Sequence, residues 1–158
     1  MKIAIGCDHA AVDFKNALKK FLIDQGHSVD DVGTQGPESV DYPDFAALVA
    51  KRVVSGEAQR GVLCCGSGIG MAIAANKVPG ARAVVLHSEW EAEFSRRHNA
   101  AKIACFGARQ HTTAMAERWL NVFLATEFEG GRHERRVVKI CGLDGSAKPA
   151  QWAGGGDA

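Results

Sequence analysis

The sequence has no long apolar run and almost no net charge. No stretch approaches the roughly 18 consecutive apolar residues that a membrane-spanning helix needs. The formal net charge is only +1, and the isoelectric point is near 7.7. This balance gives no reason to expect a membrane or a nucleic acid as a partner. Because residues 2–6 already have the pattern of a strand rather than of an export signal, we expect a cytoplasmic protein.

The sequence also has no C-x-x-C pair and no paired histidine spacing, which disfavours a zinc site. We therefore expect no metal and no cofactor. The cysteines lie mostly inside apolar segments, which suits reduced thiols better than a disulfide framework; they are Cys7, Cys64, Cys65, Cys105 and Cys141. Since neighbouring side chains of a strand point to opposite faces, one of Cys64 and Cys65 should lie in the core and the other should be free for chemistry.

Strand-like and helix-like segments alternate along the 158 residues. Short apolar runs predict strands at 2–6, 27–32, 61–65, 81–86 and 102–106. Apolar residues at helical spacing, together with capping signals, predict helices at 11–25, 42–53, 71–76, 88–97, 112–125 and 132–142. This order predicts an α/β fold, a three-layer α/β/α sandwich with a five-stranded parallel Rossmann-like sheet. We expect one domain over residues 1–143 and a mobile tail over 144–158, which is rich in Gly and Ala.

The helical spacing also predicts which side chains pack. Leu48 should lie on the buried face of the helix from residue 42. Trp90 and Trp119 are expected to be packing residues. His111 and His133 are expected to be surface or capping groups rather than ligands.

A glycine loop joins the third strand to the following helix. The segment CCGSGIG, residues 64–70, comes after an apolar strand and before the helix-like residues 71–76. A strand–loop–helix turn directs backbone N–H groups and the positive end of a helix dipole at a bound group, and that position favours the thiolate form of a cysteine. The spacing matches neither the dinucleotide fingerprint nor the P-loop. The alternative is that the glycines only allow the helix to pack closely on the strand.

In a parallel α/β sheet, ligands bind beyond the carboxyl ends of the strands. Asp8 and His9 follow the first strand, and Arg109 follows the fifth. Asp8 and His9 could act as an acid and a base, although Asp8 could equally cap the next helix. Arg109 is well placed to bind an anion. His87 is expected at the same edge.

Other polar residues allow two interpretations each. His98 and Asn99 follow Arg97 at the end of a basic helix, where they could simply form its C-terminal cap. Arg132 and Arg136 lie four residues apart on one helix face, so they could bind a phosphate or form a solvated surface. Tyr42 could be a wall of a binding site or part of the core.

Taken together, these segments resemble the type B ribose-5-phosphate isomerases, in a family that also includes galactose-6-phosphate isomerase subunits. The matching stretches run in order from residue 3 to about residue 140: IAIGCDH (3–9), VDYPD (40–44), CGSGIG (65–70) with AANK (74–77), RHN (97–99) and EGGRH (129–133). The resemblance implies a metal-independent interconversion of an aldose phosphate and a ketose phosphate. The leading pair is ribose 5-phosphate and ribulose 5-phosphate.

The resemblance also implies residue roles. Cys65 would be the base that moves a proton between C1 and C2, because the position where some relatives carry a glutamate base is Met71 here. The amides of residues 67–70 would hold the enediolate oxygen. Ring opening would use Ser67, Asp8 and His98. Phosphate would be bound by His9, Arg132 and Arg136, with Arg109 a further candidate. Tyr42 and Asn99 would contact the sugar, and the binding loop would consist of Gly66, Ser67, Gly68, Ile69 and Gly70.

Members of this family form homodimers with the active site at the subunit interface. The resemblance therefore implies a homodimer, or a tetramer built from it, in which His98, Asn99 and some arginines serve the partner's site.

Two other hypotheses are a non-catalytic phosphate-binding module and a thiol redox protein that uses Cys64 and Cys65. Another sugar phosphate, such as allose 6-phosphate, galactose 6-phosphate or a tetrose phosphate, remains an alternative substrate.

Overall fold

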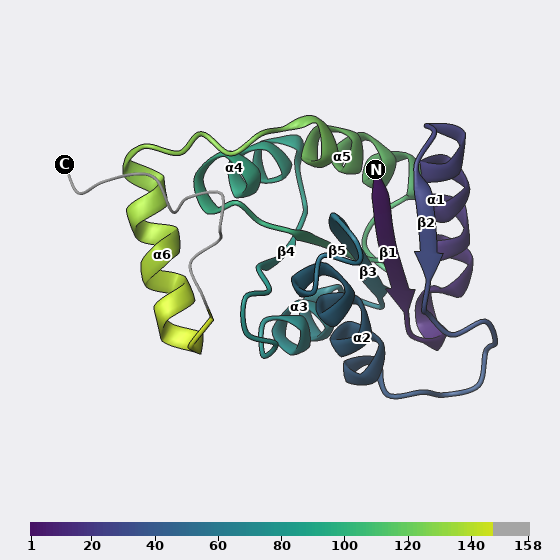
Figure 1. Ribbon diagram of the computed structural model, residues 1–158. Helices are drawn as coiled ribbons and strands as arrows, with labels where there is room; N and C mark the ends of the chain where they lie inside the picture. Colours follow the sequence, from purple (N-terminus) through teal and green to yellow (C-terminus); the bar gives the residue numbers. More distant parts are fainter. Residues whose placement is uncertain (147–158) are drawn as a thin grey trace.

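The computed structural model describes residues 1–146 and contains one parallel five-stranded sheet (Figure 1). The strand order is β2-β1-β3-β5-β4, and every neighbouring pair is parallel. The strands are β1 (Lys2–Cys7), β2 (Ser28–Asp31), β3 (Arg60–Cys65), β4 (Ala83–Val85) and β5 (Ile103–Gly107). The predicted α/β fold with five parallel strands is confirmed, although β2 and β4 are shorter than expected.

Helices cover both faces of the sheet and form two separate cores. The elements are η1 (His9–Ala11), α1 (Val12–Asp24), α2 (Tyr42–Val54), α3 (Ile69–Ala75), α4 (Glu89–Asn99), α5 (Thr113–Ala125) and α6 (Arg132–Asp144). One core joins the sheet to α1, α4 and α5, and the other joins it to α2 and α3. Successive side chains of a strand point to opposite faces of the sheet, so each strand contributes to both cores. In β1, Ile3 and Ile5 belong to the first core and Ala4 to the second.

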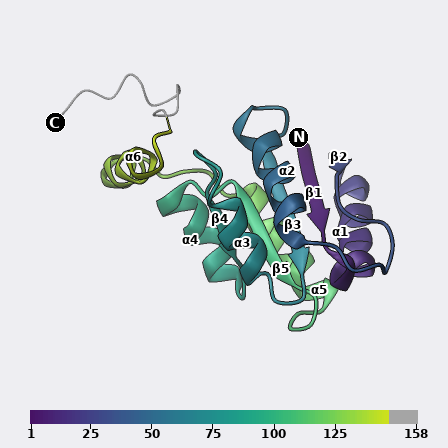
Figure 2. The same ribbon diagram turned by 90° about the horizontal axis from the view of Figure 1, so that it is seen from below.

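The last helix, α6, covers neither face of the sheet. It lies beside α4 at the margin of the molecule, outside the three layers (Figure 2). Its end is fixed to the body because the Asp144 carboxylate accepts hydrogen bonds from the N–H groups of Gly80 and Ser146, both at 2.8 Å. The part of the predicted tail from residue 147 onward lies outside the described residues.

Several side chains differ from the packing that the sequence predicted. Trp119 is buried as expected, but Trp90 is 66% exposed, because it lies on the outer first turn of α4 and stacks on Phe94 at 4.7 Å between ring centroids. Leu48 is 44% exposed, because it flanks the α2 stripe that packs on the sheet rather than belonging to it. His111 and His133, expected as surface or capping groups, are both buried.

The predicted helix caps are present. The side chains of Asp8, Ser88 and Thr112 accept hydrogen bonds from the first-turn N–H groups of η1, α4 and α5. The capping box at Ser88 is only half formed, since the Glu91 carboxylate accepts from the N–H of His87 instead of that of Ser88. The helix after the glycine loop begins at Ile69, two residues earlier than predicted.

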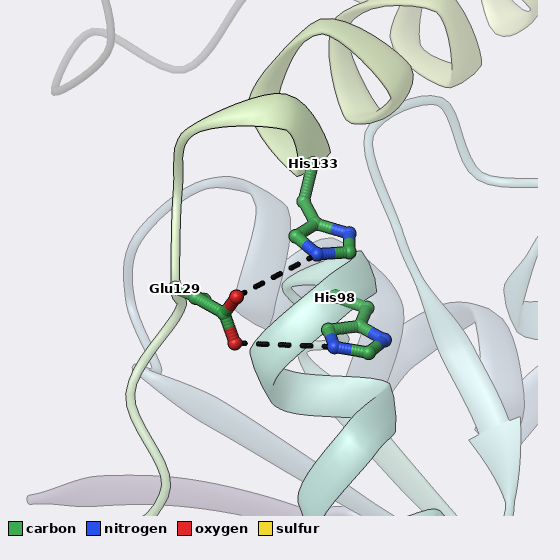
Figure 3. A group of neighbouring side chains, drawn as sticks. All are labelled: His98, Glu129 and His133. Atoms are coloured by element: carbon green, nitrogen blue, oxygen red, sulfur yellow. Dashed lines mark ion pairs between the residues drawn. The ribbon is translucent and has the colours of Figure 1, made fainter.

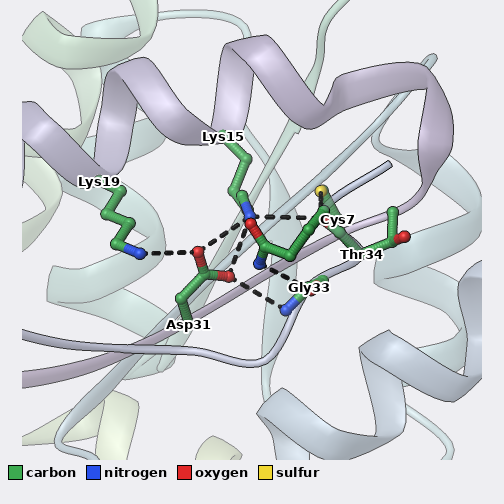
Figure 4. Close-up of polar contacts among 7 residues, drawn as sticks. Cys7, Lys15, Lys19, Asp31, Gly33 and Thr34 are labelled. Atoms are coloured by element: carbon green, nitrogen blue, oxygen red, sulfur yellow. Dashed lines mark hydrogen bonds and ion pairs between the residues drawn. The ribbon is translucent and has the colours of Figure 1, made fainter. Parts of the chain in front are cut away.

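A buried ion pair holds the chain where β2 ends (Figure 4). The Lys15 ammonium, which is fully buried, lies 2.9 Å from the carboxylate of Asp31, and Lys19 contacts the same carboxylate at 3.0 Å. Lys15 also donates to the Thr34 carbonyl, and the Thr34 N–H donates to the Cys7 carbonyl. The network therefore ties α1 and β2 to the carboxyl end of β1, directly before Asp8.

The same network shifts the titration of Asp31. Burial alone raises the pKa of a carboxyl group, but hydrogen bonds from Lys15, Lys19 and the N–H of Gly33 outweigh it and lower the pKa of Asp31. A lowered pKa in the folded state stabilises the protein above the unfolded value, which is about 4 for an aspartate. This stabilisation is lost as the pH falls through the folded value.

We predict that Asp31→Asn lowers the free energy of unfolding by about 3 kcal/mol near neutral pH, because it leaves the buried Lys15 ammonium without its counter-charge. Urea unfolding measures this value. Asp24→Asn, which removes the exposed pair with Lys20, is the control and should change stability by less than about 0.5 kcal/mol. The gap between wild type and Asp31→Asn should close as the pH falls below about 4. Equal effects of the two substitutions would contradict this account.

Candidate functional site

A cleft of about 650 Å³ opens at the carboxyl ends of β1 and β3, beside the loop that follows β5. Residues from four segments of the chain line it, and most of them are residues that the sequence singled out. They are Asp8, His9, Ala10, Tyr42, Cys65, Gly66, Ser67, Ile69, Gly70, Ile73, Arg109 and Gln110. The fold thus brings together, at the edge where parallel sheets bind ligands, residues separated by about a hundred positions.

Cys65 is the thiol that belongs to this cleft. It ends β3, is 5% exposed, and its Sγ accepts a hydrogen bond of 3.1 Å from the N–H of Gly68. Cys64 points to the other face of the sheet and lies in the other core, as the alternation along the strand predicted. One cysteine of the pair is therefore structural and the other lines the cleft.

Three of the thiols outside the cleft, those of Cys7, Cys64 and Cys105, are held in their protonated form. Burial raises the pKa of Cys7 to about 11, and complete burial raises the pKa values of Cys64 and Cys105 as well. A thiolate, not a thiol, is the reactive form of cysteine. These three side chains are thus packing residues.

The glycine loop is positioned by the end of β5. A Cβ atom on Gly107 would lie 2.8 Å from both the carbonyl carbon and the carbonyl oxygen of Ser67, so only glycine allows the two backbones to approach this closely. The N–H groups of Ala108 and Arg109 donate to the carbonyls of Cys65 and Gly66, at 2.8 and 3.1 Å. β5 therefore fixes the position of the loop that carries Cys65.

Within the loop, Gly68 adopts a left-handed backbone with φ of +79°, which a residue with a side chain rarely adopts. This turn starts α3 and directs the N–H of Gly68 at the sulfur of Cys65. The N–H of Ile69 donates to the Ser67 hydroxyl at 3.3 Å. Two of the four predicted oxyanion donors thus have partners inside the loop.

Asp8 and His9 reach the same cleft from β1. The Asp8 carboxylate accepts a hydrogen bond from the N–H of Ala10 at 3.0 Å, so it caps η1 and lines the cleft at once. His9 Nδ1 accepts from the N–H of Val40 at 3.2 Å. Because Nδ1 is an acceptor here, a neutral His9 ring carries its proton on Nε2, which leaves that nitrogen as a donor.

Two glycines let large side chains lie against the loop. A Cβ on Gly70 would meet the ring of Tyr42 at 2.8 Å, and a Cβ on Gly66 would meet the guanidinium of Arg109 at 3.3 Å. Tyr42 is exposed on its cleft side rather than part of the core. The loop therefore has the Tyr42 phenol beside Gly70 and the Arg109 guanidinium beside Gly66.

The remaining predicted site residues do not reach this cleft. His98 and Asn99 lie at the end of α4, and Arg132 and Arg136 lie exposed on α6. His98 stacks on His133 with 4.0 Å between ring centroids, and Asn99 lines a separate groove between β4 and α6. The structure thus assembles the candidate residues in two groups, one in the cleft and one where α4 meets α6.

The second group is organised by Glu129, to which sequence reasoning assigned no role. Its carboxylate lies 2.8 Å from Arg97, 3.9 Å from His98 and 3.8 Å from His133, and so joins α4 to the start of α6 (Figure 3). The spacing of four residues between Glu129 and His133 was the signal that could have revealed it. Burial, followed by repulsion from His98 and Arg132, lowers the pKa of His133.

The ligand atoms of His98, Glu129 and His133 lie within 4.8 Å of one another, a spacing that one metal ion could bridge. The two imidazole rings are stacked with an angle of only 5° between their planes. Ring-nitrogen lone pairs in parallel planes do not converge on one ion, and Arg97 already occupies the Glu129 carboxylate. The present arrangement therefore fits an ion-pair network better than a tetrahedral metal centre.

His87 lies beyond β4, at the expected edge, but contacts His111 instead of lining the cleft. The two rings are joined by a nitrogen-to-nitrogen distance of 3.1 Å, and His111 Nδ1 accepts from the N–H of Gly107 at 3.4 Å. Burial and the neighbouring His87 ring lower the pKa of His111. His111 thus supports the end of β5 from behind.

The sequence and the fold are both similar to those of known proteins. A model of the Ribose/Galactose Isomerase family matches residues 3–140. The chain is 41% identical to ribose-5-phosphate isomerase B of Escherichia coli, over 90% of this chain and 96% of that protein. It is 40% identical to D-erythrulose-4-phosphate isomerase of Pectobacterium atrosepticum, over 89% and 93%. The solved structure of ribose-5-phosphate isomerase B from Clostridium thermocellum superimposes with a TM-score of 0.90 at 47% identity, over 92% and 98%.

Proposed function

The chain belongs to the ribose/galactose isomerase family and is a sugar-phosphate isomerase, and we propose that its reaction is the interconversion of ribose 5-phosphate and ribulose 5-phosphate with Cys65 as the base. The observation that carries the proposal is the Cys65 sulfur in the cleft, with the N–H of Gly68 directed at it. Met71 is fully buried in the core below, so no carboxylate competes for the role at that position.

The proposed reaction begins with the opening of the furanose ring. Asp8 and Ser67 lie at the cleft, where they can exchange a proton with the ring oxygen and with the anomeric hydroxyl. Val40 fixes His9 as an Nε2 donor, and Arg109 adds a positive charge, so the phosphate finds both a hydrogen bond and a counter-charge. Tyr42 would contact the extended sugar.

Isomerisation then needs one base and a set of donors. The Cys65 thiolate removes the proton from C2 of the open-chain aldose, the electron pair forms the C1–C2 double bond, and negative charge develops on O1. Cys65 returns its proton to C1, while the O2 hydroxyl passes its proton to the negative O1 and the C2–O2 bond becomes the carbonyl of the ketose. Loop amides near the cleft stabilise the developing charge, and each such donor typically contributes about 3 kcal/mol.

The separation of the residues into two groups supports a homodimer, or a tetramer built from it. His98, Asn99, Arg132 and Arg136 would be supplied to the cleft by a second copy of the chain. The exposed positions of Arg132 and Arg136 on α6, away from the sheet, suit this role. In such a two-fold assembly each copy gives its α4–α6 junction and receives its partner's.

A second substrate must be compared with ribose 5-phosphate, because the two relatives with 41% and 40% identity are named for different substrates. Tetrose, pentose and hexose phosphates offer the same C1–C2 chemistry and differ in chain length. A tetrose phosphate is therefore the alternative substrate, followed by allose 6-phosphate and galactose 6-phosphate. The residues that distinguish these substrates would line the far end of the cleft.

The two other hypotheses from the sequence are less consistent with the site. Cys64 and Cys65 lie on opposite sides of the sheet, and both are free thiols, which is unfavourable for a redox pair. A pure phosphate-binding module needs no thiol beside the loop. We further propose that catalysis belongs to a single domain over residues 1–143 and that the protein is cytoplasmic, since cysteines without disulfide partners suit a reducing compartment. None of the described helices is long and apolar enough to cross a membrane.

We predict that Cys65→Ala lowers kcat for ribose 5-phosphate by at least about a hundredfold, because it removes the general base. Binding of the sugar phosphate, measured by calorimetry, should change little. Cys64→Ala is the matched control, since it removes the neighbouring thiol from the opposite face, and should keep turnover in the folded enzyme. If Cys65→Ala kept wild-type turnover, Cys65 could not be the base.

The same assays with allose 6-phosphate and a tetrose phosphate test the substrate. Ribose 5-phosphate should give the highest kcat/KM. A clear preference for a tetrose or hexose phosphate would replace the substrate and leave the role of Cys65 untouched.

Subunit complementation tests the shared site. Cys65→Ala and His98→Asn should each be nearly inactive alone, but co-expression should restore about a quarter of wild-type activity, because half of the random dimers hold one intact site out of two. As a control, two different cleft variants, Cys65→Ala and Asp8→Asn, should not complement, because both residues come from the same copy. Absence of recovery in the first mixture would show that His98 does not act across the interface.

A further inference from the structure

A second polar cavity, of about 290 Å³, lies at the amino ends of β3, β4 and β5. Parallel strands place these ends at one edge, opposite to the edge that carries the cleft. Arg60 begins β3 and Cys65 ends it, so the two sites are separated by about 16 Å along the strand. None of the residues that line this cavity is among those assigned to the isomerase site.

Four cationic side chains line the cavity. Arg60 is the first residue of β3, Arg82 directly precedes β4, Lys102 directly precedes β5, and Arg96 enters from α4. The order β3-β5-β4 makes the three strand positions neighbours. Glu127 is the single carboxylate in the lining, and it is exposed.

Three of the four cations have no ion-pair partner among the described residues. Within residues 1–146, none of Arg60, Arg96 and Lys102 has a carboxylate within the 4.0 Å of an ion pair. Arg96 is 4% exposed, and the Nε of Arg60 is buried without a hydrogen-bond partner. A buried polar group without a partner costs free energy.

Burial and mutual repulsion also disfavour the charged forms of these side chains. Burial, followed by repulsion from Arg60, lowers the pKa of Arg96 to about 10. Burial lowers the pKa of Arg60 and, together with repulsion from Arg82, that of Lys102. Each lowered pKa means that folding disfavours the charged form.

Part of the cluster has a structural role. Arg82 donates to the carbonyl of Ala100, and Arg96 donates to those of Ala101 and Thr126, so both satisfy carbonyls around the end of α4. This role explains why two guanidinium groups are buried there. It does not explain the buried Nε of Arg60 or the ammonium of Lys102, which adds a further positive charge to the same cavity.

We propose that this cavity binds a phosphate-type oxyanion, either free phosphate or the phosphate group of a small metabolite, at a site separate from catalysis. The volume suits a group of that size, and an oxyanion accepts hydrogen bonds from several guanidinium groups at once. Its charge would compensate the cations of the lining and give the Arg60 Nε a partner.

Phosphate binding is tested in the Arg132→Gln/Arg136→Gln protein, where the proposed catalytic phosphate ligands are already weakened. Thermal unfolding is followed with increasing inorganic phosphate at an ionic strength held constant with sodium chloride. We expect the midpoint to rise with phosphate. Adding Arg60→Gln/Lys102→Gln should abolish most of this rise and weaken binding, measured by calorimetry, by at least about tenfold.

Adding Lys20→Gln/Lys51→Gln instead is the matched control, because it removes two exposed cations elsewhere and should leave the phosphate effect unchanged. Without phosphate, Arg60→Gln/Lys102→Gln should unfold at the same or a higher temperature than its parent, since it relieves repulsion. A purely structural cluster would instead lose stability and keep its response to phosphate. That result, or a rise no larger than chloride produces, would overturn the proposal.

Glycerol phosphate in place of inorganic phosphate distinguishes the two sources of the anion. Similar affinity for both would identify the phosphate group of a metabolite, because an ester must fit through the mouth of the cavity. Binding of inorganic phosphate alone would identify the free ion.

Discussion

The close contact between the end of β5 and the glycine loop determines the geometry of the candidate active site. Gly107 lies against the backbone of Ser67 so closely that a Cβ atom would reach it at 2.8 Å. Hydrogen bonds from Ala108 and Arg109 to the loop carbonyls continue this contact. The contact places the Cys65 sulfur at the cleft and directs the N–H of Gly68 at it. The packing at the end of β5 thus determines which backbone N–H group lies next to the Cys65 sulfur.

The other side of the cleft depends on a buried charge. The ion pair of Lys15 with Asp31 holds the chain after β2 against the end of β1, and Asp8 and His9 follow from there. A buried ion pair is weak evidence for net stability but fixes a geometry strongly, because breaking it leaves a charge without a partner. The Gly107–Ser67 contact therefore positions the glycine loop on one side of the cleft. The Lys15–Asp31 ion pair positions the end of β1, with Asp8 and His9, on the other.

The sequence predicted the layers and the cleft well, for a physical reason. Periods of two and of 3.6 residues report burial directly, and parallel connections bring the carboxyl ends of the strands together. Asp8, Cys65 and Arg109 could therefore be placed at one edge before any coordinates. At Asp8 the geometry confirms the cap and places the same carboxylate in the lining of the cleft, while its catalytic role stays a prediction.

Other features depend on contacts that periodicity does not report. Trp90 and Leu48 are apolar residues of the kind found in cores, but they lie outside the buried stripes of their helices. Glu129 matters because α6 turns back toward α4, and a linear pattern does not show this. The cations at the amino edge are scattered over more than forty positions and become a cluster only through the strand order β3-β5-β4.

The most direct measurement of the central claim is kcat of Gly107→Ala in comparison with Gly142→Ala. A Cβ on Gly142, within α6, meets nothing within 4 Å, so its replacement should leave both stability and turnover nearly unchanged or slightly improve stability. Gly107→Ala should force the loop away from β5, cost about 1–3 kcal/mol of stability, and reduce the turnover of the protein that remains folded by at least tenfold. Wild-type turnover in Gly107→Ala would contradict the claim that this contact positions the sulfur.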